Sequence, residues 1–98
     1  MATLTTVPPF TSGADVRIDL ISGWDISPFS IINAFAGADT ISGAGSSIGV
    51  QVRGELYAGA GDDVISGTGT YCGILNLYPA STNSVILDTG TGNDSILG

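Results

Sequence analysis

Gly59-Ala60-Gly61-Asp62-Asp63-Val64-Ile65 is the segment that decides the fold, because a glycine turn, an aspartate and an apolar residue follow one another closely. The Gly-x-Asp core of this segment recurs along the chain. Its copies are Gly13-Ala14-Asp15, Gly37-Ala38-Asp39, Gly61-Asp62-Asp63 and Gly92-Asn93-Asp94. The aspartates lie 24, 24 and 31 residues apart, which indicates a 24-residue repeat with a seven-residue insertion in the last interval.

Apolar residues keep the same register around these aspartates. Seven positions before the last three aspartates stand Ile32, Leu56 and Leu87, and two positions after them stand Ile41, Ile65 and Ile96. Between the turns, we align Trp24 and Ile26 with Ile48 and Val50. We place the insertion at residues 78–84, which have the composition of a loop.

The repeat predicts an all-β fold, a parallel β-solenoid or β-roll of about three to four rungs with Gly-Asp turns. Fifteen glycines and four prolines disfavour helices, and glycine supplies turn conformations with positive φ. The competing interpretation is an antiparallel sandwich, which gives no reason for similar turns at a fixed spacing. One solenoid domain is expected over residues 13–98.

The first repeat departs most from the pattern. Asp15 is followed by Val16-Arg17-Ile18, so we expect its inward apolar residue to be shifted by one position. Residues 1–12 contain Pro8-Pro9, which an interior strand does not tolerate. This segment is therefore expected to form an N-terminal arm, a cap or an edge.

Charge and composition exclude several classes of function. Nine acidic residues face two basic ones, there is no histidine, and the net charge is −7. Such a chain has no basic patch for nucleic acid, and no apolar run is long enough to span a membrane. A single cysteine and no histidine leave little of the usual catalytic equipment, so we do not expect an enzyme. The first ten residues lack the pattern of a cleaved secretory signal peptide.

Two of the turns resemble a known family. Gly59-Ala60-Gly61-Asp62-Asp63-Val64-Ile65 and Gly90-Thr91-Gly92-Asn93-Asp94-Ser95-Ile96 are similar to the G-x-G-x-D-x-apolar core of the repeats-in-toxin (RTX, haemolysin-type) calcium-binding nonapeptide. The segment Gly37-Ala38-Asp39-Thr40-Ile41 is a shorter match, with Phe35 where the earlier glycine belongs. The family's nonapeptide recurs back to back, whereas here one copy appears in each longer repeat.

The resemblance implies a β-roll in which Ca²⁺ lies between the turns of neighbouring rungs. Carboxylate and backbone carbonyl oxygens are the ligands that Ca²⁺ prefers. The metal candidates that follow are Asp39, Asp63 and Asp94, then Asp15 and Asp62, with the turn glycines Gly37, Gly61 and Gly92; Asp88 could assist. The alternative is that these turns bind no metal, because Gly-Asp and Asn-Asp pairs favour tight turns by themselves. We expect Asp25, which lies outside the turns, to be a solvated surface residue.

Two hypotheses for the function follow. The first is a calcium-stabilised structural protein that assembles head to tail with copies of itself into an extracellular filament or surface matrix, and that contacts cell-surface or matrix components. The second is a calcium-folded RTX-like module, a fragment of a larger secreted enzyme or adhesin. Both place the protein outside the cell or at its surface, exported without a cleaved leader, because calcium is abundant there. Ice or sugar binding by a rung face is left open.

Overall fold

The computed structural model describes residues 1–6, 9–28, 30–76 and 86–97. These residues form strands, turns and bends, and none of them is helical. The strands are β1 (Ala2–Thr3), β2 (Val16–Asp19), β3 (Trp24–Ile26), β4 (Ile31–Asn33), β5 (Thr40–Ala44), β6 (Ile48–Val52), β7 (Glu55–Tyr57), β8 (Val64–Thr68), β9 (Cys72–Asn76), β10 (Ile86–Asp88) and β11 (Ser95–Leu97). No helix in the described ranges could therefore cross a membrane.

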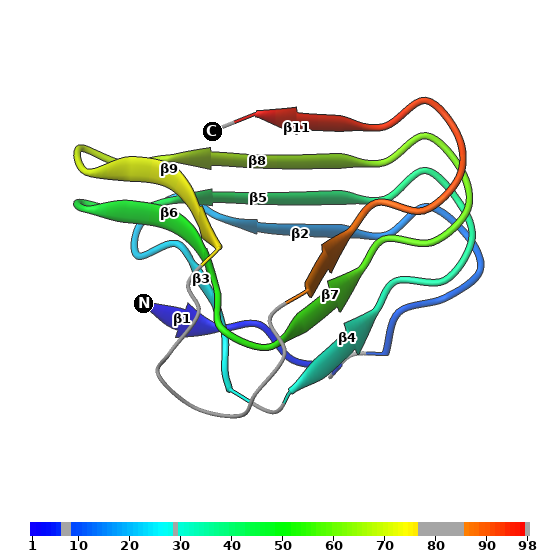
Figure 1. The fold of residues 1–98 in the computed structure, drawn as a ribbon, viewed down its shortest axis with the longest axis horizontal. Coiled ribbons are helices and arrows are strands. Elements are labelled where there is room, and N and C mark those ends of the chain that lie inside the picture. The colour runs from blue at the N-terminus through cyan, green and yellow to red at the C-terminus, as the bar shows by residue number, and fades with distance from the viewer. Residues whose placement is uncertain (7–8, 29, 77–85, 98) are drawn as a thin grey trace.

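The strands form three sheets in which every pairing is parallel (Figure 1). Sheet A has the order β1-β3-β6-β9, sheet B the order β2-β5-β8-β11, and sheet C the order β4-β7-β10. From β2 onward the chain visits sheets B, A and C in turn, so that each repeat adds one strand to each sheet. The prediction of an all-β chain built on parallel strands is confirmed.

The repeat seen in the sequence is the register of sheets B and C. Ile41 pairs with Ile65 and Ile65 with Ile96, while Leu56 pairs with both Ile32 and Leu87. These are the two apolar series that the sequence aligned, and they join equivalent positions of successive repeats. The predicted insertion at residues 78–84 falls outside the described residues.

The register of sheet A corrects one alignment. Trp24 pairs with Val50 and Ile26 with Val52, which is 26 residues further along and not 24. The first repeat uses two residues fewer between its strands in sheets B and A, and two more between its strands in sheets A and C. Its total length is unchanged, so the spacing of the aspartates does not report the difference.

The core lies between the three sheets. Its described residues are almost completely shielded from solvent and come from every sheet and from the N-terminal segment: Leu4, Phe10, Ile26, Ile32, Ala34, Ile41, Val50, Val52, Leu56, Ala58 and Ile65. Burial of each large aliphatic side chain contributes about 1.5–3 kcal/mol, and a single repeat offers too few of them to be stable alone. Stacking of the repeats is therefore what makes the core.

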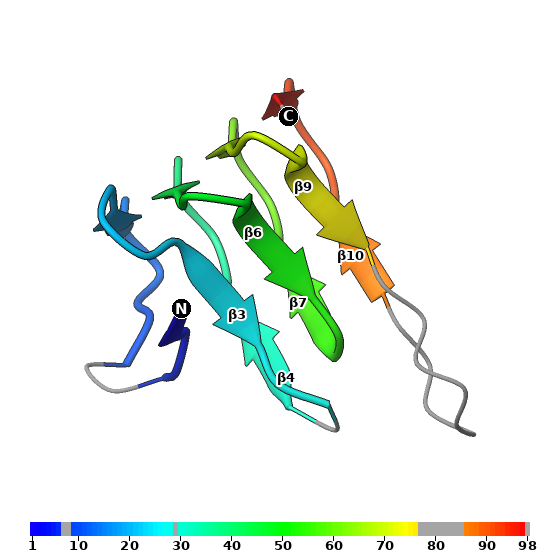
Figure 2. The ribbon, with the colours of Figure 1, turned by 90° about the vertical axis from the view of Figure 1, so that its left-hand side faces the viewer.

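The N-terminal segment covers one end of this core. β1 pairs with the edge of β3, and Leu4 donates its N–H to the carbonyl oxygen of Asp25 at 2.9 Å. Leu4 is 1% exposed and Phe10 5% exposed. In Figure 2 this segment lies at one end of the row of β3, β6 and β9, and β11 lies at the other end.

Arg17 corrects the expectation for the first repeat. It pairs with Ile41 and so takes the inward position of β2, while Val16 and Ile18 on either side are more than half exposed. Its guanidinium lies 4.3 Å from the centre of the Phe10 ring, a cation–π contact. The apolar residue is thus not shifted; a long cationic side chain replaces it at the covered end of the core.

Candidate functional site

The turns before sheet B stack on one another because of their glycines. Gly37, Gly61 and Gly92 have φ values of 105°, 109° and 110°, a region that residues with a Cβ rarely adopt. A Cβ on Gly61 would also overlap the carbonyl oxygen of Gly37, and one on Gly92 would overlap that of Gly61. The turns therefore lie in direct backbone contact, and each brings its aspartate next to the aspartate of the following repeat.

The four turn aspartates form a hydrogen-bonded series, which we call the aspartate ladder: Asp15, Asp39, Asp63 and Asp94. The N–H of Asp15 donates to Oδ1 of Asp39 at 2.8 Å, and the N–H of Asp39 donates to Oδ1 of Asp63 at 2.9 Å. The N–H of Asp63 likewise donates to Oδ1 of Asp94 at 2.9 Å. Each of these acceptor carboxyl groups thus receives a bond from the repeat before it.

Main-chain bonds run in the opposite direction beside the ladder. The N–H groups of Thr40, Val64 and Ser95 donate to the carbonyl oxygens of Asp15, Asp39 and Asp63, each at 2.8 Å. Neighbouring repeats are therefore joined at every turn by one side-chain bond and one main-chain bond. This pairing explains why aspartate, with a short side chain and an acceptor oxygen, recurs at this position.

The two central carboxyl groups are removed from water. Asp39 is 2% exposed and Asp63 1% exposed, and Oδ2 of each has no hydrogen-bond partner within the described residues. Burial raises the pKa of Asp39 above its usual value; the N–H of Asp15 opposes this, and the charges of Asp63 and Asp15 add to it. Burial also raises the pKa of Asp63. The hydrogen bond from the N–H of Asp39 lowers this pKa, and the charge of Asp94 raises it further.

The two ends of the ladder differ from its centre. Both carboxylate oxygens of Asp15 accept bonds from Thr11, from its N–H to Oδ2 at 2.8 Å and from its hydroxyl to Oδ1 at 3.1 Å. Thr11 thereby holds this carboxylate from within the first repeat. Asp94, at the other end, is only partly buried.

The other predicted acidic candidates lie beside the ladder. Asp62 is exposed, and its Oδ1 accepts the N–H of Asn93 at 2.9 Å across the same pair of repeats. Asp88 is exposed in sheet C and caps its own turn by accepting the N–H of Gly90 at 2.8 Å. In both residues Oδ1 therefore already accepts a main-chain N–H.

The hydrogen bonds of the aspartate ladder limit which oxygen atoms a calcium ion could bind. Across the described residues, no group of three or more acidic or cysteine side chains could hold a metal ion. The Oδ1 atoms of Asp39, Asp63 and Asp94 accept N–H groups, and the carbonyl oxygens of Gly37 and Gly61 lie against the next turn. The buried Oδ2 atoms of the two central aspartates are the oxygens left for a cation or a proton. Calcium binding stays a prediction.

Asp25 corrects a further expectation. It is 7% exposed, not solvated, and forms an ion pair with Arg53: Nε donates to Oδ1 at 2.9 Å and Nη2 to Oδ2 at 2.5 Å. The repeat does not predict this pair, because the partners are 28 residues apart, which does not match the 24-residue spacing. The composition alone pointed toward such a pair. The chain has two basic residues, so a buried acid has few possible cationic partners.

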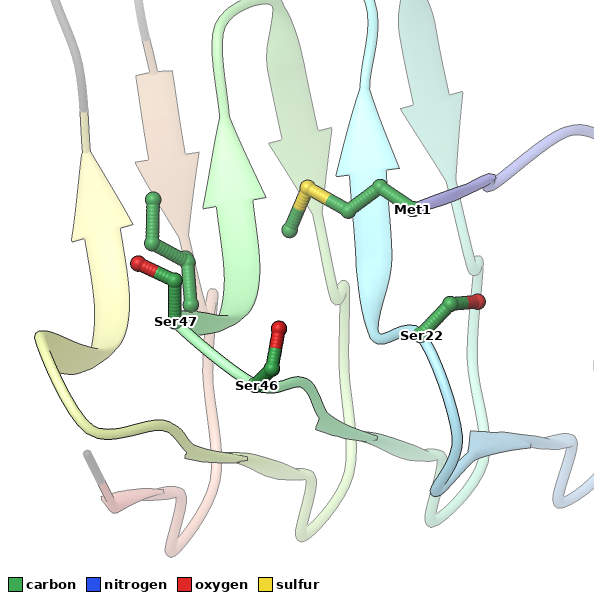
Figure 3. A pocket seen from close by; sticks show the side chains of 5 residues that line it. Met1, Ser22, Ser46 and Ser47 are labelled. Carbon is green, nitrogen blue, oxygen red and sulfur yellow. The ribbon is translucent and has the colours of Figure 1, made fainter.

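One shallow depression lies outside the ladder (Figure 3). It has a volume of about 150 Å³ and is lined by Met1, Ser22, Ser46, Ser47 and Ile48. Figure 3 shows serine hydroxyls around it and the Met1 side chain extending across it. This lining offers hydroxyl groups but no carboxylate, thiol or cationic side chain.

Comparisons with known proteins return no match to a family model, a curated protein or a solved structure. The resemblance to the RTX repeat therefore depends on the turn motifs alone.

Proposed function

We propose that the chain is a structural β-solenoid module that stacks end to end on further copies of itself. The observation that carries the proposal is the common order of the three parallel sheets. Each sheet has one edge built from early residues, β1, β2 or β4, and one built from late residues, β9, β11 or β10. The edge N–H and C=O groups at one end of the molecule are thus complementary to those at the other end.

The order of the strands supports a continuous stack. The chain visits sheet B, then A, then C, and β11 belongs to sheet B. The next strand in that order belongs to sheet A, and β1 of a second copy is a sheet A strand. Placed beside β9, it would continue the same winding. A contact between different surfaces that repeats by translation along one axis does not close, so it produces a fibre.

The apolar surface of the late end also supports this contact. Ile96 follows Ile41 and Ile65 in the inward series of sheet B, yet it is 49% exposed, whereas those two are 1% exposed. Covering Ile96 with the Phe10 and Arg17 end of a second copy would stabilise the contact by about 1 kcal/mol. The edges of sheets A and B would add main-chain hydrogen bonds.

The aspartate ladder can continue across such a contact. The N–H of Asp94 is the next donor in the series, and Asp15 of the second copy supplies the next carboxylate. Oδ1 of Asp15 accepts one bond, from the Thr11 hydroxyl, and a carboxylate oxygen accepts two. The acceptor therefore has room for one more N–H.

Calcium is the second element of the proposal, favoured by the buried Oδ2 atoms of Asp39 and Asp63. A cation there would offset the repulsion between stacked carboxylates. The alternative function, a calcium-folded module of a larger secreted protein, uses the same atoms. That module would stay monomeric at all concentrations and gain β structure on addition of calcium. An extracellular location belongs to both versions.

The experiment compares Ile96→Lys with Gln51→Lys, which adds the same charge to a partly exposed residue of β6, an inner strand of sheet A that lies at neither end of the molecule. Size-exclusion chromatography and electron micrographs are taken in calcium and in excess chelator. We expect wild type and Gln51→Lys to form fibres and Ile96→Lys to remain monomeric with an unchanged circular dichroism spectrum. Monomeric wild type at every concentration would contradict the proposal. Loss of wild-type fibres in chelator would assign calcium to them.

A further inference from the structure

The outer face of sheet B differs from the outer faces of the other two sheets in its charge. Its outward residues include Val16 and Ile18 of β2, Val64 and Ser66 of β8 and Leu97 of β11, and the rest are alanine, serine and threonine. No outward position in these four strands carries a charge. Sheet C presents Glu55 and Asp88 outward, and sheet A carries Asp25.

This face is also apolar at its margins. Val16 is 55%, Ile18 53% and Leu97 60% exposed, although each lies in a regular strand. In the middle of the face, the hydroxyls of Ser42 and Ser66 are hydrogen-bonded to each other at 2.8 Å. Two hydroxyls that are hydrogen-bonded to each other have a lower free-energy cost of desolvation than two unpaired ones. The centre of the face therefore tolerates burial.

Because each copy carries a net charge of −7, two copies repel unless the contact keeps their charges apart. Sheet C would bring Glu55 and Asp88 into such a contact, and sheet A would bring the Asp25–Arg53 ion pair, whereas sheet B would bring no charged side chain. We propose that this face is the side-by-side contact between copies, through which neighbouring fibres pack sheet to sheet. The inference rests on the proposed function, since it requires the copies to be stacked end to end first.

The size of the face explains that requirement. Four strands about 4.8 Å apart, with a rise of about 3.3 Å per residue, present about 300 Å². A stable contact between two proteins buries about 800 Å² on each partner, so one pair of faces binds weakly. A stack of copies repeats the face along the fibre, and the contacts then act together. Single copies should accordingly not pair through this face, whereas fibres should form bundles.

The test compares Ser66→Asp, in the middle of the face, with Gln51→Glu on the outer face of sheet A. Both change the net charge equally, and Gln51 lies in the inner strand β6, away from the ends that stack. Fibre width in electron micrographs and low-speed pelleting measure the bundling. We expect wild type and Gln51→Glu to form bundles, and Ser66→Asp to form single fibres with at least about tenfold less pelleted protein.

A second variant, Thr68→Lys, guards against a folding defect in Ser66→Asp. It charges an exposed position of the inner strand β8 and is expected to unbundle the fibres as well. Bundles of Ser66→Asp and Thr68→Lys that match wild type would overturn the inference. So would single wild-type fibres, including fibres that instead adsorb to ice or to a neutral polysaccharide. Single wild-type fibres leave the end-to-end proposal intact, whereas a wild type without any fibres overturns both.

Discussion

The main-chain N–H of Asp39 donates to carboxyl Oδ1 of Asp63 at 2.9 Å, across one 24-residue repeat. Both residues are almost fully buried, and the second oxygen of each carboxyl group has no hydrogen-bond partner within the described residues. The turn aspartates are therefore structural acceptors that tie each repeat to the next. Their charge is the unfavourable part of the arrangement, and a proton or a cation relieves it.

The stability of the protein should rise as the pH falls from about 7 toward about 4. The pKa values of Asp39 and Asp63 are raised above the usual 3.8, so the folded state binds more protons than the unfolded state in that window. The stabilisation is complete below the unfolded pKa and is lost as the pH rises through the folded pKa. Thermal denaturation in chelator, followed by circular dichroism, measures it. A midpoint that falls steadily as the pH is lowered between those values would contradict the account.

Below pH 3.8, the usual pKa of aspartate, the trend should reverse. The pKa of Asp19 is lowered by the N–H groups of Ser22 and Ile21, so its contribution is lost as the pH falls through the folded pKa. A maximum of stability close to the usual aspartate pKa is therefore expected. In Asp19→Asn the decline on the acid side should be shallower than in wild type, and equal declines would remove Asp19 from the explanation.

Asp63→Asn should leave the free energy of unfolding at neutral pH within about 1 kcal/mol of wild type, whereas Asp63→Ala should lower it by about 1–3 kcal/mol. Asparagine keeps the acceptor for the N–H of Asp39 and removes the buried charge. Alanine leaves that buried N–H without its acceptor. Urea denaturation in chelator distinguishes the two. If calcium holds the turn, Asp63→Asn should instead lose the stabilisation that wild type gains on adding calcium.

Gly61→Ala should destabilise the fold by at least about 2 kcal/mol, because φ is 109° and the new Cβ overlaps the Gly37 carbonyl. Gly13 occupies the same place in the first repeat and is the matched control. Its φ is ordinary, and a Cβ there would meet its nearest neighbour, Thr11 Oγ1, at 3.6 Å. Gly13→Ala should therefore be close to neutral. Equal losses of denaturation midpoint in the two variants would show that the turns do not stack as described.

Phe35→Gly should raise stability by about 0.5–1 kcal/mol. Phe35 has a φ of 66°, is about half exposed, and stands where Gly59 and Gly90 stand in the later repeats. Glycine would relieve the left-handed strain at a small loss of buried apolar surface. A lower denaturation midpoint in this variant would mean that contacts of the Phe35 ring outweigh the strain.

The sequence predicted the parts of the fold that repeat. The series Ile41, Ile65 and Ile96, and the stacking of the turn aspartates, follow from the constant offset of two residues between aspartate and isoleucine and from a 24-residue interval with one insertion, so counting residues is sufficient. The parts of the fold that do not repeat could not be predicted by counting residues. The position of Trp24 depends on two compensating changes of corner length, and the burial of Asp25 depends on Arg53, which is not one repeat away. For the residues of the ladder the turn motif predicts metal ligands, because spacing does not reveal that a carboxyl group accepts a main-chain N–H.

An intermolecular disulfide tests the end-to-end contact most directly. Thr3, Asp25, Gln51 and Leu75 occupy one series in sheet A, so Thr3 of a second copy would lie beside Leu75. Neighbouring parallel strands place paired Cα atoms about 5 Å apart, within disulfide range. With Cys72 replaced by Ser, oxidised Thr3→Cys/Leu75→Cys should give a ladder of multimers on a non-reducing gel, and each single variant should give dimers at most. Monomers alone from the double variant, at concentrations where wild type forms fibres, would contradict the account.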